Sequence, residues 1–298
     1  MNITKSGMIA LVGRPNVGKS TLTNALVGEK IAIVTNKPQT TRNRICAVLN
    51  RGETQFVFVD TPGLHKARTK LGEYMVGVVK QSVADVDAVC LLVEPIPHIG
   101  TPEAELIQRI KGLGVPAVLV INKIDTVKKE DLLAVMQTYA AELDWTAVVP
   151  ISAKNAEGLD GLLETLDTLV PEGPQLFPDD MVTDQPERQV MAEILREKLL
   201  LCLDKEIPHG TAVEITKFSE REETEIIDVH ATIYCEKDSH KGIIIGKQGA
   251  MLRKISTLAR QDMERFMGTK VYLETWVKVK ENWRDSISQV RNFGYKDE

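Results

Sequence analysis

The sequence lacks any run of 18 apolar residues, so we expect no transmembrane helix. Residues 1–6 lack the apolar core of a secretory signal, which favours a cytoplasmic protein. Only four cysteines occur in 298 residues, and none forms a C-x-x-C pair, which is typical of reduced thiols rather than of disulfides or a zinc site. A net charge of −5 argues against nucleic-acid binding by the chain as a whole.

The first part of the chain has the pattern of an α/β domain. Apolar runs alternate with helical patterns between residues 8 and 170, which predicts a mostly parallel sheet with helices on both faces. Ligands of such folds bind at the carboxyl ends of the strands. The predicted strands are Met8–Val12, Cys46–Leu49, Phe56–Val59, Ala88–Val93, Ala117–Ile121 and Ala147–Ile151.

A proline- and glycine-rich stretch follows at 171–178 and indicates a linker between two domains. The remainder predicts a smaller α+β domain. Its expected helices are Glu187–Leu203 and 248–267, and its expected strands are Thr211–Phe218, Glu225–Cys235 and Lys270–Lys280. We therefore expect domains at 1–172 and 188–298, joined by a linker at 173–187.

The stretch Gly13-Arg-Pro-Asn-Val-Gly-Lys-Ser20 matches G-x-x-x-x-G-K-[ST] between a predicted strand and helix. Glycines let backbone N–H groups surround phosphates, Lys19 can reach the β- and γ-phosphates, and Ser20 can ligate Mg²⁺. A glycine-rich turn without a ligand is the alternative, and the flanking strand and helix disfavour it. The sequence therefore predicts a nucleoside-triphosphate site.

Two later motifs indicate the base. Asn122-Lys-Ile-Asp125 follows a predicted strand, and an Asp carboxylate there can accept two hydrogen bonds from guanine but not from adenine. Asn122 would hold the loops together, and the stem of Lys123 would lie over the base. Ser152-Ala-Lys154 follows the next strand, where its amides could meet the guanine carbonyl. The tripeptide alone is a weak signal.

Two segments have the pattern of nucleotide-dependent switches. In Asp60-Thr-Pro-Gly63, the Asp60 carboxylate is placed to hold Mg²⁺ through water, and the Gly63 amide can approach the γ-phosphate. Either Thr40 or Thr41 would complete the Mg²⁺ shell only when triphosphate is bound. A solvated turn is the alternative for the two threonines. We take Thr41 as the metal ligand together with Ser20 and Asp60.

The second domain contains Gly246-Lys-Gln-Gly249 between an apolar run and a predicted helix. This matches the GXXG loop of KH domains, whose glycines let a nucleic-acid backbone come close. From 237 to 284 there are 11 basic and 5 acidic residues, which indicates a basic face. A solvated helix face is the alternative. Trp276 and Trp283 could stack on bases, but we predict that Trp276 belongs to the core.

The candidate residues fall into four groups. We expect catalysis to depend on Asn16, Lys19, Thr41 and Gly63. The predicted nucleotide contacts are Gly13, Arg14, Pro15, Asn16, Val17, Gly18, Lys19, Ser20, Thr21, Asp60, Thr61, Pro62, Gly63, Leu64, Asn122, Lys123, Ile124, Asp125, Ser152, Ala153 and Lys154. The predicted metal ligands are Ser20, Thr41 and Asp60. The predicted RNA contacts are Lys241, Gly242, Ile243, Ile244, Ile245, Gly246, Lys247, Gln248, Gly249, Arg253 and Lys254.

The order of these motifs resembles the translation-factor-like class of GTPases over residues 8–170. That resemblance implies GTP and GDP as ligands with Mg²⁺. The position after Gly63 departs from the Ras-type pattern, because Leu64 replaces the Gln that orients the attacking water. We therefore expect slow intrinsic hydrolysis. In related GTPases without the Gln, an Asn at the position of Asn16 accompanies a K⁺ ion, so K⁺ is a candidate activator.

The pairing of these motifs with K-G-I-I-I-G-K-Q-G resembles the Era family of bacterial GTPases over nearly the whole chain. The resemblance implies a type II KH domain, binding of the 3′ end of 16S rRNA and a role in assembly of the 30S ribosomal subunit. It also implies peripheral association with the inner membrane. We expect a monomer.

Other classes of function stay open at this point. One is an RNA-modification GTPase, but residues 181–298 contain no candidate nucleophile or metal cluster, since His209, His230 and His240 are isolated. A second is a scaffold with a static nucleotide. A third is a membrane-surface module, because the predicted helix at 248–267 is basic and amphipathic.

Overall fold

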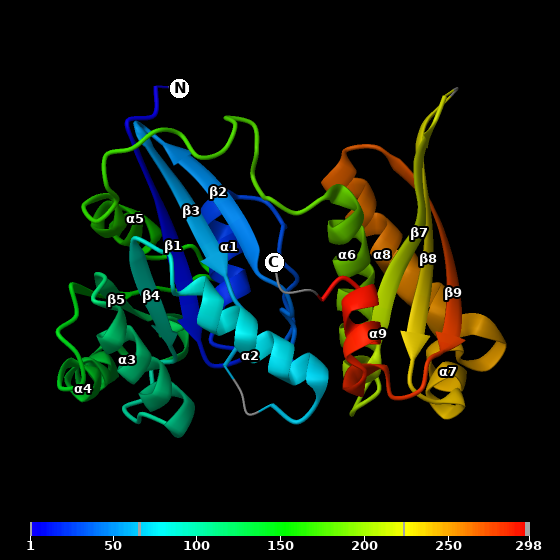
Figure 1. Cartoon of the computed structure of the whole chain (residues 1–298), viewed down its shortest axis with the longest axis horizontal. Helices are drawn as coiled ribbons and strands as arrows, with labels where there is room; N and C mark the ends of the chain where they lie inside the picture. Colours follow the sequence, from blue (N-terminus) through cyan, green and yellow to red (C-terminus); the bar gives the residue numbers. More distant parts are fainter. Residues whose placement is uncertain (1, 65–66, 223, 296–298) are drawn as a thin grey trace. The chain divides into compact units, whose positions relative to one another are not determined.

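The computed structural model describes residues 2–64, 67–222 and 224–295 (Figure 1). Its contacts divide the chain into two compact units. The first comprises Met1–Ala32, Thr41–Ala67 and Met75–Asp184, and the second comprises Ile33–Thr40, Arg68–Tyr74 and Gln185–Glu298. The second unit thus includes two short segments from the first half of the sequence.

The first unit contains a six-stranded sheet of order β2-β3-β1-β4-β5-β6. All neighbours are parallel except β2 and β3, which pair in antiparallel fashion, so the predicted mostly parallel sheet is confirmed. The strands are β1 (Lys5–Gly13), β2 (Ile45–Arg51), β3 (Thr54–Asp60), β4 (Ala88–Val93), β5 (Ala117–Ile121) and β6 (Ala147–Pro150).

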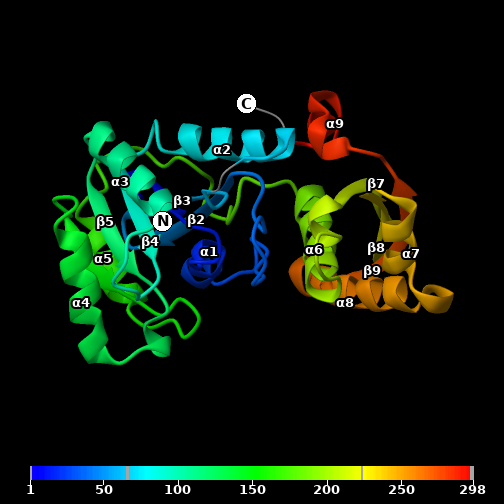
Figure 2. The ribbon, with the colours of Figure 1, turned by 90° about the horizontal axis from the view of Figure 1, so that it is seen from below.

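Helices cover both faces of this sheet because the central strands are apolar on both sides. Leu11 and Leu92 pack with α1 and α5 on one face, whereas Leu91 and Leu119 pack with α2, α3 and α4 on the other. Figure 2 shows α1 and α2 on opposite sides of β2 and β3. The helices are α1 (Lys19–Val27), α2 (Lys70–Ser82), α3 (Thr101–Leu113), α4 (Lys129–Ala140) and α5 (Leu159–Asp167).

The second unit contains a three-stranded sheet of order β7-β8-β9. Strands β7 and β8 are antiparallel, whereas β8 and β9 are parallel. Leu195 of α6 and Met263 of α8 pack with Val229 and Ile233 of β8 in one core. The elements are α6 (Glu187–Cys202), β7 (Ala212–Arg221), β8 (Thr224–Cys235), α7 (Asp238–Ile245), α8 (Ala250–Met267), β9 (Lys270–Val279) and α9 (Ile287–Asn292).

The two tryptophans of this unit have opposite environments. Trp283 is fully buried, and its indole N–H donates to the carbonyl of Gly210 at 2.9 Å, so it is a core residue and cannot stack on bases. Trp276 is 41% exposed and its ring lies 5.6 Å from that of His230. The predicted core position of Trp276 is therefore wrong. The reason is strand alternation, because Val277 on the opposite face faces the helices instead.

Part of the predicted linker is held against the first unit. The side-chain oxygen of Gln55 accepts the N–H groups of Leu176 and Phe177 at 2.8 Å each. The carboxylate of Asp184 accepts the N–H of Cys46 at 3.0 Å. These bonds tie residues 176–184 to β2 and β3. Within the described ranges, none of the helices is sufficiently long and apolar to span a membrane.

Candidate nucleotide site and RNA-binding loop

The predicted nucleotide motifs follow β1, β3, β5 and β6 directly. Since β1, β3, β4, β5 and β6 run parallel, their carboxyl ends lie at one edge of the sheet. The phosphate loop (residues 13–20), the Asp60 segment (60–63), the Asn122 loop (122–125) and the Ser152 loop (152–154) therefore meet at that edge, where ligands of open α/β sheets bind.

The phosphate loop needs glycine because neighbouring loops approach it closely. Gly18 has a φ of 101°, and a Cβ atom there would lie 2.2 Å from the side-chain nitrogen of Asn122. Gly63 packs on the loop from the other side, where a Cβ atom would lie 2.6 Å from the Cα of Pro15. Asn16 is exposed with a φ of 65°. Any side chain at 18 or 63 would displace the phosphate loop.

Lys19 lies inside the loop. Its ammonium donates to the carbonyls of Gly13 at 3.1 Å and Arg14 at 3.0 Å. Burial lowers the pKa of Lys19 to about 8, and the nearby Asp60 partly offsets this effect. A bound phosphate would favour the protonated ammonium. The site is thus built to receive negative charge.

The three predicted metal ligands form one cluster. The hydroxyl of Ser20 donates to Asp60 Oδ2 at 2.7 Å and lies 2.8 Å from the hydroxyl of Thr41. Thr40 instead donates to the carbonyl of Lys37 at 2.7 Å, so the structure brings Thr41 and not Thr40 to Ser20.

The environment of Asp60 fits a cation. The carboxylate is fully buried, and its Oδ1 has no hydrogen-bond partner within the described residues. Burial raises the pKa of Asp60 to about 6, whereas Lys19 and the hydrogen bond from Ser20 lower it. An unpartnered buried oxygen beside two hydroxyls is the oxygen-rich set that Mg²⁺ prefers.

The residues after Asp60 are held by hydrogen bonds to the backbone of β1. The hydroxyl of Thr61 donates to the carbonyl of Leu11 at 2.8 Å, and the N–H of Leu64 donates to the carbonyl of Gly13 at 3.3 Å. The side chain of Leu64 is buried in the core beneath the sheet edge. It has no polar atom, so it cannot orient a water molecule.

Asn122 joins three loops. Its amide nitrogen donates to the carbonyl of Val17 at 2.8 Å, and its oxygen accepts the N–H of Ala153 at 3.0 Å. The hydroxyl of Ser152 donates to Asp125 Oδ1 at 2.7 Å, which orients the exposed carboxylate. The Asn122 loop, which we call the base-recognition loop after its predicted role, and the Ser152 loop are thus one hydrogen-bonded assembly.

Sequence reasoning missed two carboxylates near this edge. Glu94, directly after β4, lies 2.6 Å from the ammonium of Lys123 and 3.3 Å from the guanidinium of Arg14. Glu103 lies 2.9 Å from Arg14 Nε. No motif marks these residues, and only the position of β4 between β1 and β5 brings Glu94 to both loops.

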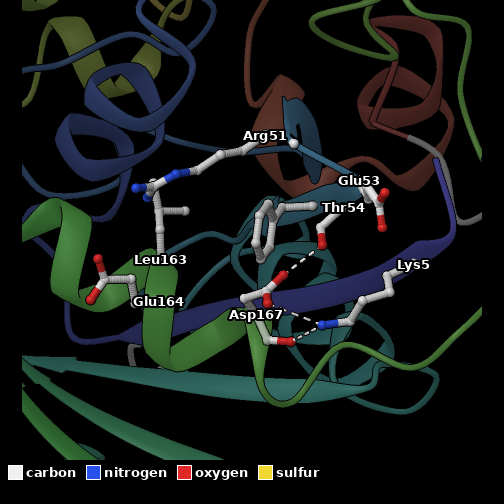
Figure 3. Close-up of a pocket in the computed structure, with 9 residues that line it drawn as sticks. Lys5, Arg51, Glu53, Thr54, Leu163, Glu164 and Asp167 are labelled. Atoms are coloured by element: carbon white, nitrogen blue, oxygen red, sulfur yellow. Dashed lines mark hydrogen bonds and ion pairs between the residues drawn. The ribbon is translucent and has the colours of Figure 1, made fainter. Parts of the chain in front are cut away.

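A separate cavity of about 450 Å³ lies at the opposite edge of the first unit's sheet (Figure 3). It is lined by side chains that include Lys5, Arg51, Phe56 and Asp167. Asp167 accepts hydrogen bonds from Thr54 at 2.5 Å and Lys5 at 3.1 Å, which hold its pKa below the usual value. None of the nucleotide motifs lines this cavity.

In the second unit, the GXXG loop joins two helices. Helix α7 ends at Ile245 and is capped by Gly246, which has a φ of 72°, and α8 begins after Gly249, which has a φ of 76°. A Cβ atom at Gly246 would lie 2.7 Å from that of Met251, whereas Gly249 faces open space. Lys247 and Gln248 are exposed between the glycines. The loop thus presents backbone and one positive charge to solvent.

The predicted RNA contacts around the loop divide by exposure. Ile243 is half exposed, and Arg253 and Lys254 are exposed near the start of α8. Ile244, however, is fully buried in the core, so its predicted place in a base-binding groove is wrong. The run of isoleucines belongs to α7, and the helical period turns its middle member inward.

The first unit has the site of a GTPase of the phosphate-loop class, because one sheet edge carries a phosphate loop, an Asp–Ser–Thr cluster and an Asn-Lys-x-Asp loop. The second unit adds an α+β fold with a GXXG loop. Residues 8–123 match a family described as 50S ribosome-binding GTPase, and residues 206–284 match the KH domain family.

Full-length relatives share this combination. The chain is 51% identical to GTPase Era of Ruminiclostridium cellulolyticum over 98% of both chains, and 50% identical to GTPase Era of Clostridioides difficile over 98% of this chain and 99% of the relative. The chain belongs to the Era family of GTPases, and it hydrolyses GTP.

Two solved structures are similar over nearly the whole chain. One is Aquifex aeolicus Era bound to GDP and AlF4−, with 39% identity and a TM-score of 0.94, covering 98% of this chain and all of that one. The other is Era in complex with MgGDPNP and nucleotides 1506–1542 of 16S ribosomal RNA, with 38% identity and the same TM-score, covering 99% and 100%.

Proposed function

We propose that this protein is a guanine-nucleotide switch that binds the 3′ end of 16S rRNA and assists assembly of the 30S subunit. The proposal depends on one observation. The same chain has a sheet edge at which the predicted nucleotide motifs meet and, in its second unit, an exposed GXXG loop. The similar structure bound to nucleotides 1506–1542 of 16S rRNA supports the choice of RNA. We also propose GTP, GDP and Mg²⁺ as ligands and the domain boundaries 1–172, 173–187 and 188–298.

In this proposal the chain positions the nucleotide and stabilises its negative charge, and no side chain forms a covalent bond to it. Mg²⁺, when bound, neutralises developing charge on the phosphate oxygens. Ser20, Thr41 and Asp60 would hold it. Lys19 would neutralise the phosphates from inside the loop, and the Gly63 amide would fix the γ-phosphate. Asp125, oriented by Ser152, would select guanine.

We predict that K⁺ accelerates GTP hydrolysis, because Leu64 supplies no group to orient water and the exposed Asn16 on the phosphate loop can ligate a cation. We expect a turnover rate about tenfold higher in K⁺ than in Na⁺. This is below the factor of about 10²–10³ in kcat that the loss of one strong electrostatic contact costs. Phosphate release at equal ionic strength measures it. Equal rates in the two salts, or an unchanged K⁺ effect in Asn16→Ala, would contradict this proposal.

We further propose that nucleotide state and RNA binding are coupled. The segment Ile33–Thr40, which precedes the metal ligand Thr41, belongs to the second unit. Within that unit, the N–H of Val34 donates to Glu197 at 3.0 Å, and the guanidinium of Arg196 donates to the carbonyl of Thr40. Lys198 beside them pairs with Asp262 of α8 at 2.5 Å. A γ-phosphate that orders Thr41 would therefore act on a segment bonded to α6.

We propose that the protein is a cytoplasmic monomer with peripheral association with the inner membrane. The apolar residues Ile255, Ala259 and Met263 of α8 pack in the core of the second unit. Arg253 and Lys254 are exposed on the same helix. Membrane contact would therefore occur through basic side chains rather than through insertion of α8.

Crosslinking of bound RNA in cells, followed by sequencing, tests the proposed target. We expect recovery of the 3′ end of small-subunit rRNA. A variant with a disrupted GXXG loop serves as the control and should lose the signal. Enrichment of transfer or messenger RNA in its place would contradict the proposed function.

A further inference from the structure

A single carboxylate lies between the two loops that contact opposite ends of a nucleotide. Glu94 follows β4, and β4 lies between β1, which leads into the phosphate loop, and β5, which leads into the base-recognition loop. Its Oε1 is 2.6 Å from the ammonium of Lys123, and its Oε2 is 3.3 Å from Nη2 of Arg14. Each oxygen of one carboxylate thus holds a cation from a different loop.

Arg14 also has a second ionic partner, on α3. Its Nε lies 2.9 Å from Oε1 of Glu103, which is only 1% exposed. The other oxygen of Glu103 accepts the N–H of Gly100 at 2.8 Å and caps α3. Burial and the neighbouring Glu103 raise the pKa of Tyr139, so this phenol stays neutral beside the carboxylate. The guanidinium of Arg14 therefore has a second ionic contact, with α3, which packs on the sheet.

This arrangement makes Glu94 the link between Arg14 of the phosphate loop and Lys123 of the base-recognition loop. Lys123 has a φ of 65°, a conformation that side chains rarely adopt, so its loop needs contacts that hold it. The pairs are only partly exposed, so charge-assisted bonds persist there more than on an open surface. Without the Glu94 carboxylate, Lys123 would lose this ion pair, and Arg14 would keep only its contact with Glu103.

We propose that Glu94 is a positioning residue that sets the spacing between the phosphate subsite and the base subsite. Ligands that span both subsites depend on this spacing, whereas ligands that occupy the phosphate loop alone do not. The proposal rests on the assignment of this site to guanine nucleotides and is independent of RNA binding.

The test compares a spanning ligand with a short one. In Glu94→Gln we expect GDP affinity to fall about five- to tenfold, as for the loss of one charge-assisted contact. Inorganic pyrophosphate, measured by competition with fluorescent GDP, should keep its affinity within about twofold. KM for GTP should rise with kcat nearly unchanged, because the spacing serves ground state and transition state alike.

Two further variants complete the design. Glu105→Gln on α3 makes the same chemical change at an exposed position outside the cluster and should bind GDP as the parent does. Glu94→Asp keeps the charge and should recover most of the affinity, and it covers the case in which Glu94→Gln fails to fold. Unchanged GDP affinity in Glu94→Gln, or equal losses for GDP and pyrophosphate, would overturn the proposal. Failure of the parent protein to bind GDP would instead overturn the site assignment.

Discussion

Replacement of Asp125 by Asn is expected to lower GTP affinity by about two orders of magnitude and to raise affinity for xanthosine triphosphate. In the proposed site the carboxylate would accept from two donors of guanine, and hydrogen bonds to charged groups contribute about 1.5–3 kcal/mol each. The Asn amide would instead donate to the 2-oxo group of xanthine. Because Asn can still accept the hydroxyl of Ser152, which lies 2.7 Å from Asp125 Oδ1, the loop should keep its shape.

Titration with fluorescent nucleotides measures this exchange of specificity. Asp131→Asn, at an exposed position on α4, is the matched control and should leave GTP affinity unchanged. Equal losses of GTP and xanthosine triphosphate binding would indicate a damaged loop. Retained GTP affinity would show that Asp125 does not read the base.

The double change Lys247→Asp and Gln248→Asp is expected to lower affinity for single-stranded RNA at least tenfold and to leave basal GTP hydrolysis unchanged. Both side chains are exposed between the glycines of the loop, so folding should be preserved. The change removes one positive charge and adds two negative charges where a phosphate backbone would approach.

Filter binding or anisotropy with the 3′-terminal 16S rRNA sequence measures the effect at fixed salt. Lys129→Asp with Gln137→Asp, at exposed positions of α4, makes the same charge change in the first unit. RNA affinity should stay at the parent level in this control. A comparable loss in both double variants would mean that net charge, not the GXXG loop, controls binding.

The sequence predicted the fold where each strand is a continuous apolar run. The predicted bounds of β4 and β5 are those of the structure, because these central strands are buried on both faces. The exposed position of Trp276 was harder to predict from the sequence, since a strand pattern defines two faces but not which face the helices cover. The alternation of Lys270, Tyr272 and Trp276 with apolar neighbours contained the relevant signal.

The site residues also differ in how well the sequence could predict them. The positions of the phosphate loop and of the Asn122 loop were predictable because each motif directly follows a strand of the parallel sheet. Glu94 was not, because its role depends on the order of strands in the sheet, which brings β4 between the two loops. The sequence motif admitted either Thr40 or Thr41, and the distance of 2.8 Å between the hydroxyls of Thr41 and Ser20 supports the choice of Thr41. Sequence patterns predict local structure, whereas contacts between distant segments can be identified only when the three-dimensional fold is known.

The affinity of the 3′-terminal 16S rRNA sequence for the protein, loaded with a non-hydrolysable GTP analogue or with GDP, tests the central claim most directly. We predict that RNA binds more tightly to the GTP-analogue state, by at least about fivefold, as for typical coupling energies. By linkage, RNA should then raise affinity for the GTP analogue relative to GDP by the same factor. Equal RNA affinity in the two nucleotide states would contradict the account of this protein as an RNA-binding switch.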